Sequence, residues 1–194
     1  MFWDERYSED GHAYGTEPND WIRACGPKLE GPVLCLAEGE GRNAVFLAGL
    51  GLDVHAMDQS AVGVRKMGEL AAQLGVPLQV EQGDLTDFDL GSERWGAIVG
   101  VFHHLPPTLR ADVHARVVQA LRPGGVYAFE AYTPRQLQFG TGGPPVVEML
   151  FEPEIIRAEL AGLQPEHFAE VERDIQEGKY HQGTSATLQG LLRK

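Results

Sequence analysis

Short apolar runs alternate with segments of helical spacing along most of this chain. The apolar runs are rich in Val, Ile, Leu and aromatic residues, which predicts β-strands over residues 33–37, 53–57, 77–81, 96–101 and 126–131. Between them, apolar residues recur three and four positions apart, which predicts helices over residues 42–50, 60–74, 108–121 and 153–161. This alternation favours right-handed βαβ units and a parallel sheet with helices on both faces.

The end of the chain departs from this pattern. Residues 166–175 and 184–192 read as two strands, and the loop between them is too short for a crossover helix. Strands joined by so short a loop pair antiparallel. We therefore predict an α/β fold: a mostly parallel seven-stranded sheet with an antiparallel C-terminal strand.

The composition is that of an acidic globular protein, with 194 residues, a net charge of −12 and a pI near 4.9. Nucleic-acid binding needs clustered Lys and Arg, so this charge argues against such a partner. No apolar stretch is long enough for a membrane span, and the acidic N-terminus is unlike a signal peptide. Cys25 and Cys35 are too few for a metal cluster and suit a reducing compartment. We expect one domain, residues 1–194, in the cytoplasm, with Cys35 buried in its strand.

Residues 33–43, VLCLAEGEGRN, carry the strongest indication of function. A strand-like run breaks into a loop containing Gly39 and Gly41, and a helical segment follows, as in the first unit of nucleotide-binding α/β folds. The glycines permit a tight turn and let a ligand lie against the main chain. Asp58 ends the next strand, where such folds place an acid on ribose hydroxyls. The alternative for Asp58 is a cap on the helix over 60–74.

These motifs, taken in order, resemble those of the class I S-adenosylmethionine (SAM)-dependent methyltransferases. The matching segments are the loop at 38–41, Asp58, Gly83-Asp84 after the third strand, VGVFHHLPP after the fourth and LRPGG before the fifth. The N-terminal residues and EAYTPRQLQFGTGGPP look like a bacterial subgroup near the tellurite-resistance (TehB-like) and thiopurine-type methyltransferases. The resemblance implies a Rossmann-like sheet, SAM as cofactor and methyl transfer as the reaction.

The resemblance also implies which residues bind the cofactor. They are Glu38, Gly39, Gly41, Asn43, Asp58, Gln59, Asp84, Leu85 and Val101. Asp84 is expected to accept from the adenine amino group, with Leu85 against the ring.

The first motif departs from the DLGxGxG of the family. Cys35 and Ala37 stand where the family has its acid and its first glycine. We expect Glu38 to take over part of the missing acid's role beside the ammonium group of the cofactor. The alternative is that Glu38 is a solvated loop residue.

Two histidines, His103 and His104, follow the fourth strand at the edge where α/β sheets bind ligands. We expect His104 to act as a general base or to orient the acceptor, since imidazole titrates near neutrality. Tyr132, Arg135 and His181 are expected to line the acceptor pocket. The alternative for the two adjacent histidines is a structural role.

Residues 1–30 hold an aromatic set that precedes the first strand: Trp3, Tyr7, Tyr14 and Trp21. We expect this segment to form a helical lid over the cofactor, with Tyr14 or Arg6 near the cofactor's carboxylate. Packing of an N-terminal helix on the sheet is the alternative.

The sequence therefore predicts a SAM-dependent methyltransferase, a monomer or homodimer, acting on a small molecule. A soft nucleophile such as a thiol, tellurite or selenite suits the subgroup, and tellurite resistance is the matching role. A SAM-binding regulator or pseudo-enzyme, a protein-modifying methyltransferase and an NAD(P)-dependent oxidoreductase stay open as alternatives. The antiparallel tail argues against the oxidoreductase.

Overall fold

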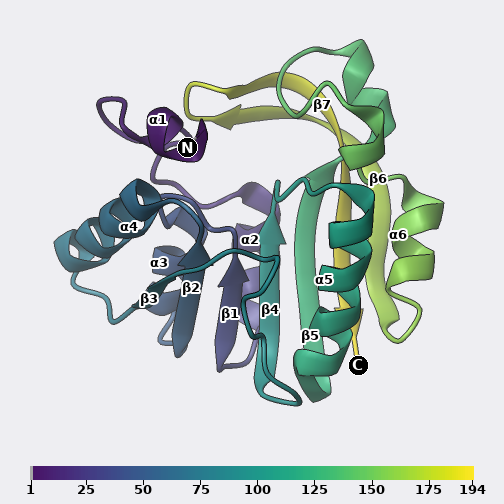
Figure 1. Ribbon diagram of the computed structural model, residues 1–194, viewed down its shortest axis with the longest axis horizontal. Helices are drawn as coiled ribbons and strands as arrows, with labels where there is room; N and C mark the ends of the chain where they lie inside the picture. Colours follow the sequence, from purple (N-terminus) through teal and green to yellow (C-terminus); the bar gives the residue numbers. More distant parts are fainter. Residues whose placement is uncertain (1) are drawn as a thin grey trace.

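Seven strands form one mixed sheet in the order β3-β2-β1-β4-β5-β7-β6 (Figure 1). The structure is a computed structural model that describes residues 2–194. The strands are β1 Val33–Leu36, β2 Val54–Asp58, β3 Gln79–Gln82, β4 Trp95–Val101, β5 Leu121–Tyr132, β6 Gln164–Glu177 and β7 His181–Arg193. Strands β1 to β5 run parallel, whereas β7 is antiparallel to both of its neighbours, β5 and β6. The predicted fold class is confirmed.

Helices cover both faces of this sheet. They are α1 Phe2–Tyr7, α2 Asp20–Cys25, α3 Arg42–Gly49, α4 Ala61–Leu74, α5 Pro107–Ala120 and α6 Pro153–Glu159, with 3-10 turns η1 Gly26–Lys28, η2 Pro134–Gln138 and η3 Val147–Met149. Side chains alternate along a strand, so β1 serves two cores. Leu34 and Leu36 pack with α5 and α6, while Val33 and Cys35 pack with α2 and α3. Cys35 is fully buried, as predicted.

The observed elements differ from the predicted ones mainly at their ends. Strand β5 begins at Leu121, inside LRPGG, because Leu121 already pairs with Trp95 before a register shift. Strands β6 and β7 extend to residues 177 and 181, so only a short turn joins them. The longer hairpin reaches beyond the sheet edge toward α1 (Figure 1).

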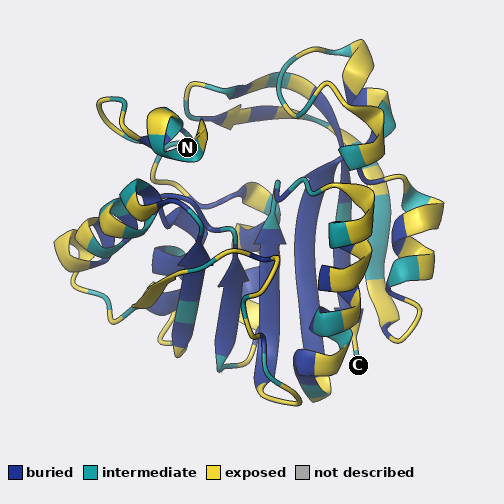
Figure 2. Ribbon diagram, in the orientation of Figure 1, coloured by how far each residue is buried: buried dark blue, intermediate teal, exposed yellow. Residues whose placement is uncertain are grey.

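The central strands β1 and β4 are buried except at Val101, the last residue of β4, and they end at one edge of the sheet (Figure 2). The N-terminal segment and the β6–β7 hairpin lie over this edge and contact each other: the Lys179 amide donates to the Ala13 carbonyl at 2.9 Å. Helix α1 is held to the start of α4, where the Ser60 hydroxyl donates to Asp4 at 2.6 Å. Across residues 2–194, every helix falls short of the length and apolar character needed to cross a membrane.

Candidate functional site

A cavity of about 140 Å³ lies where β1, β2 and β4 end. Seven of the predicted site residues line it: Glu38, Gly39, Asn43, Asp58, Gln59, Val101 and His104. The rest of its lining comes from the N-terminal segment, the glycine loop with the start of α3, the loop after β4 and the β6–β7 hairpin: Trp3, Tyr7, Tyr14, Gly15, Ala37, Glu40, Arg42, Phe102, His103, Leu105 and His181. The cavity thus brings together residues from both ends of the chain.

Glu38 caps helix α3 from the loop that precedes it. Its Oε1 accepts from the amides of Asn43 and Ala44, both at 2.8 Å. The side chain is buried, and this burial raises its pKa to about 7. The alternative of a solvated loop residue is therefore wrong. Glu38 also lines the cavity.

Asp58 ties the glycine loop to the start of α4. Its two oxygens accept from the amides of Gly39 and Ser60, each at 2.8 Å. Burial is the main cause that raises the pKa of Asp58. The N-cap of α4 is Ser60, whose hydroxyl accepts from Gly63, so the predicted alternative of a capping role belongs to Ser60. A carboxylate has about four acceptor sites, so Asp58 keeps capacity for ribose hydroxyls.

At both glycines of the loop the structure leaves no room for a side chain, but the neighbouring residues differ. Both have positive φ, +66° at Gly39 and +94° at Gly41, where a side chain is strained. A Cβ at Gly39 would come within 2.7 Å of the Tyr7 hydroxyl. The Tyr7 side chain packs on this loop and lines the cavity. A Cβ at Gly41 would meet Met67 of α4 at 2.4 Å. Gly41 is outside the cavity lining, so what the structure shows for it is packing against α4.

Asp84 and Leu85 are also outside the cavity lining. Asp84 is exposed and accepts from the amide and hydroxyl of Thr86 at 2.9 and 2.8 Å, which lowers its pKa. Leu85 is buried in the core beneath α5, where its carbonyl accepts from Arg116. The structure thus gives both residues local roles in a turn, and their adenine contact stays a prediction.

His104, in the loop after β4, is held by hydrogen bonds within the protein. His104 Nε2 accepts from the Tyr132 amide at 3.4 Å, so Nδ1 carries the proton and donates to the Met149 carbonyl at 3.1 Å. Both ring nitrogens are thereby engaged, and burial lowers the pKa of His104 to about 4. This arrangement favours the structural alternative, although His104 lines the cavity. The Nδ1 atom of His181 is buried without a hydrogen-bond partner among residues 2–194, and His181 lines the cavity as well.

The other two residues expected at the acceptor pocket lie elsewhere. Tyr132 is fully buried, with its ring stacked on Phe102 at 4.5 Å between centroids. Arg135 pairs with Glu170 and Glu172 on the outside of β6. Arg135 lies within the 3-10 turn η2, which directs it away from the cavity, and its position after β5 did not reveal this.

The N-terminal aromatic side chains divide between the two predicted roles. Trp3, Tyr7 and Tyr14 line the cavity, and Trp3 stacks on Tyr7 at 5.6 Å between ring centroids. Trp21 instead packs on His167 at 4.4 Å, and its indole N–H donates to the Gly190 carbonyl. Only the part of the segment before α2 therefore faces the cavity.

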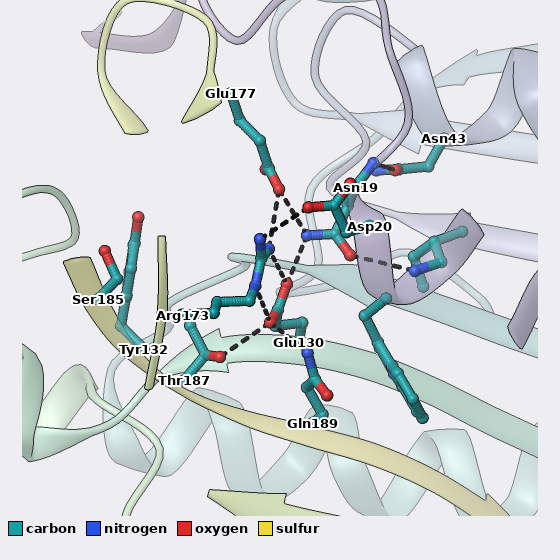
Figure 3. Close-up of polar contacts among 12 residues, drawn as sticks. Asn19, Asp20, Asn43, Glu130, Tyr132, Arg173, Glu177, Ser185, Thr187 and Gln189 are labelled. Carbon is teal, nitrogen blue, oxygen red and sulfur yellow. Dashed lines mark hydrogen bonds and ion pairs between the residues drawn. The ribbon is translucent and has the colours of Figure 1, made fainter. Parts of the chain in front are cut away.

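A buried network of ions and amides braces the cavity from the side of the hairpin (Figure 3). Glu130 of β5 accepts from Arg173 at 2.9 and 2.6 Å, and from Asn19 at 2.5 Å. Arg173 also donates to Glu177 at 2.9 Å, and Glu177 accepts from Arg42 at 2.6 Å. The network joins the N-terminal segment, α3, β5 and β6. No sequence motif indicated it, because its members are far apart along the chain.

Comparison with known proteins finds similarity to methyltransferases in the central part of this chain. Residues 33–125 match the family model described as a methyltransferase domain. A curated relative, the 2-heptyl-1-hydroxyquinolin-4(1H)-one methyltransferase of Mycobacteroides abscessus, is 27% identical over 131 residues. The match covers 66% of this chain and 56% of that relative, so the chain spans little more than half of its length.

Solved structures share the fold. TehB from Haemophilus influenzae superposes with a TM-score of 0.73 at 18% identity, covering 90% of this chain and 61% of that one. A structure described by the conversion of a disulfide bond into a thioacetal group during echinomycin biosynthesis has a TM-score of 0.76 at 19% identity, covering 100% of this chain and 90% of that one. At these identities the likeness concerns the fold.

Proposed function

We infer that this chain, whose residues 33–125 match a methyltransferase domain, is a class I SAM-dependent methyltransferase that transfers a methyl group from SAM to a small molecule. One observation carries the proposal: the carboxylates Glu38 and Asp58 and the Gly39 main chain meet in one cavity, next to the glycine loop of that domain. SAM supplies a methyl group activated by a positively charged sulfur, so the protein has mainly to align the acceptor and exclude water.

The residues of the cavity fit this cofactor by charge. Glu38, Glu40 and Asp58 surround a cavity whose ligand carries a positive sulfur and an ammonium group. Asp58 accepts from two amides, which leaves acceptor sites for ribose hydroxyls, and the Glu38 carboxylate lines the cavity where it can accept from the ammonium group. The charge of each carboxylate is thus held in place by backbone N–H groups before a ligand arrives.

The N-terminal segment is proposed to act as the lid. Small-molecule pockets usually enclose about 300–1,000 Å³, several times the volume of this cavity. Tyr7 lies directly on Gly39, and Trp3 stacks on Tyr7. Movement of α1 would open the space that a nucleoside needs, and its return would cover the site from water.

The acceptor is proposed to meet the cavity at the end formed by Phe102, His103, His104 and His181. A thiolate or an oxyanion of tellurium or selenium needs little help from a base, which agrees with a His104 whose nitrogens are both engaged. The aromatic rings also suit a planar acceptor such as the hydroxyquinolone in the name of the curated relative. For an acceptor that must lose a proton, the unpartnered Nδ1 atoms in the lining are those of His103 and His181. Burial lowers the pKa of both imidazoles to about 3, so each is a weak base in this structure.

Calorimetry with SAM, S-adenosylhomocysteine and NADH tests the proposal. We expect micromolar-range binding of the first two and none of NADH. Activity on thiols, tellurite, selenite and a hydroxyquinolone then separates an enzyme from a SAM-binding regulator, which would bind without turnover. Tight binding of NADH in place of SAM would refute the proposal.

Asp58→Ala makes the same test on one residue. Removal of the carboxylate takes away two charge-assisted bonds to ribose, each contributing about 1.5–3 kcal/mol, so affinity for S-adenosylhomocysteine should fall at least about tenfold. The amides of Gly39 and Ser60 also lose their acceptor, so the melting temperature should drop as well. An unchanged dissociation constant would reduce Asp58 to a link between the loop and α4.

A further inference from the structure

Arg42, the first residue of α3, carries an unused hydrogen-bond donor at the cavity. Its side chain is only 8% exposed and lines the cavity. Nη1 is buried and has no hydrogen-bond partner among residues 2–194. A buried guanidinium nitrogen without an acceptor is costly, so its place beside a ligand cavity indicates a group that the ligand supplies.

The other nitrogen of the same guanidinium is held firmly. Nη2 donates to Glu177 at 2.6 Å, and Glu177 in turn accepts from Arg173 at 2.9 Å and Asn19 at 3.0 Å. Figure 3 shows Glu177 bound by both Arg173 and Asn19. Glu177 thus fixes one arm of the guanidinium of Arg42 and leaves the other arm for an acceptor.

Arg42 is the sole Arg or Lys among the described residues that line the cavity. Of the three carboxylates there, Glu40 is already bound by Lys66 at 3.0 Å and by the Ala13 amide at 2.7 Å. Glu38 lies at the same loop, close enough for the charge of Arg42 to favour its ionised form. An anion on Arg42 and a cation on Glu38 would therefore be adjacent.

We propose that Arg42 binds the α-carboxylate of the cofactor through Nη1, with Glu177 as the positioning residue that orients it. The α-amino-acid end of SAM carries a carboxylate and an ammonium group on one carbon, which matches the adjacent Arg42 and Glu38. This assignment rests on the proposed function and extends it.

Arg42 thereby replaces Arg6 and Tyr14 in the role that we predicted from the sequence for one of them. The guanidinium of Arg6 lies 3.8 Å from the centroid of the Tyr180 ring and contacts the Tyr14 hydroxyl at 3.4 Å, and Arg6 is outside the cavity lining. Arg42, in contrast, already has one arm fixed at the cavity. The sequence signal was present in the GRN that follows the glycine loop, but it did not show where the side chain points.

Paired ligands test the assignment in the unmodified protein. S-adenosylhomocysteine and its methyl ester share the ammonium group and the nucleoside, and only the acid has the carboxylate. We expect calorimetry to show that the wild type binds the acid at least about tenfold more tightly, as a charge-assisted pair requires. Equal affinity for both would overturn the proposal, and binding of neither would refute the proposed function itself.

Variants then assign the preference to Arg42. In Arg42→Gln the preference for the acid over the ester should fall to less than about twofold, with affinity for the ester nearly unchanged. Glu177→Gln should reduce the preference partially, because Arg42 keeps its charge and loses its orientation. Arg65→Gln, on the exposed face of α4, is the matched control and should bind as the wild type does.

A loss of affinity that is equal for acid and ester in Arg42→Gln would show a purely structural role for Arg42 and overturn the assignment. If circular dichroism shows that Arg42→Gln does not fold, Arg42→Lys is measured in its place. A wild-type preference for the acid in Arg42→Lys would overturn the assignment of the carboxylate to Nη1 of the guanidinium.

Discussion

The two sides of the cavity are held in place in different ways. On the side of the glycine loop, Glu38 and Asp58 accept from backbone amides that lie within six positions of Glu38 and within 19 positions of Asp58. On the side of the hairpin, Glu130 and Glu177 bind side chains, and their partners are up to 158 positions away. The first side depends on local chain geometry and the second on the assembly of the whole sheet.

This difference has a physical consequence for stability. A carboxylate that accepts from backbone amides keeps its partners as long as the local loop and helix are formed. A carboxylate paired with arginines depends on distant strands reaching their register, and the loss of one partner leaves a buried charge uncompensated. We expect the hairpin side to govern global stability and the loop side to govern ligand affinity.

Glu130→Ala should give the largest effect of the predicted changes. Glu130 is fully buried and accepts from Asn19, Arg173, Thr187 and Gln189. Its removal leaves the Arg173 guanidinium short of its main partner, and we expect the free energy of unfolding to fall by about 3–5 kcal/mol. Urea denaturation followed by circular dichroism measures this change.

Glu166→Ala is the matched control for Glu130→Ala. Glu166 of β6, the strand that also carries Arg173, pairs with Arg193 of β7 at 2.5 Å, but both side chains are more than two-fifths exposed. Exposed pairs contribute little, so the urea midpoint should hardly move. Equal losses in the two variants would contradict the contrast between the two sides of the cavity.

Glu38→Gln should have an intermediate effect that depends on pH. Burial raises the pKa of Glu38 from 4.5 to about 7, so between these values the folded chain holds a proton that the unfolded chain has lost. The contribution of Glu38 to stability is therefore full below about pH 4.5 and is lost as the pH rises through about 7. The unfolding free energy of the wild type relative to Glu38→Gln should fall over this range by about 1–3 kcal/mol.

Cofactor affinity should rise with pH as Glu38 ionises, whereas the contribution of Glu38 to stability falls. If the Glu38 carboxylate binds the ammonium group, the wild type should bind S-adenosylhomocysteine more tightly at about pH 8 than at about pH 6, and Glu38→Gln should lack this gain. Calorimetry at both values makes the comparison. Parallel pH profiles for the two proteins would remove Glu38 from the binding site and leave it as the cap of α3.

Asp84→Ala should have the smallest effect. Asp84 is exposed and its partners are in its own turn, so affinity for S-adenosylhomocysteine should change by less than about threefold. Comparison with the analogue that carries hypoxanthine in place of adenine tests the adenine contact directly. A tenfold loss for the adenine ligand alone would restore that role to Asp84 and extend the binding site beyond the cavity.

The sequence alone predicted the order of the elements, the antiparallel end of the sheet and the glycine loop. These features follow from short-range rules: apolar periodicity within a strand or helix, turn residues between them, and a loop too short for a crossover helix. The same local reasoning placed Glu38, Gly39 and Asp58 near one another, because the carboxyl ends of neighbouring parallel strands share an edge of the sheet.

The tertiary structure alone decided how each polar side chain is used. Glu38 caps α3 because the start of this helix directs two amides at its carboxylate. Both ring nitrogens of His104 are hydrogen-bonded, one to the Tyr132 amide and one to the Met149 carbonyl. Arg42 and Glu177 are 135 positions apart, and only the packing of α3 beside the hairpin brings them together. Contacts of this kind depend on the register of β5, β7 and β6, and no local pattern of the chain encodes that register.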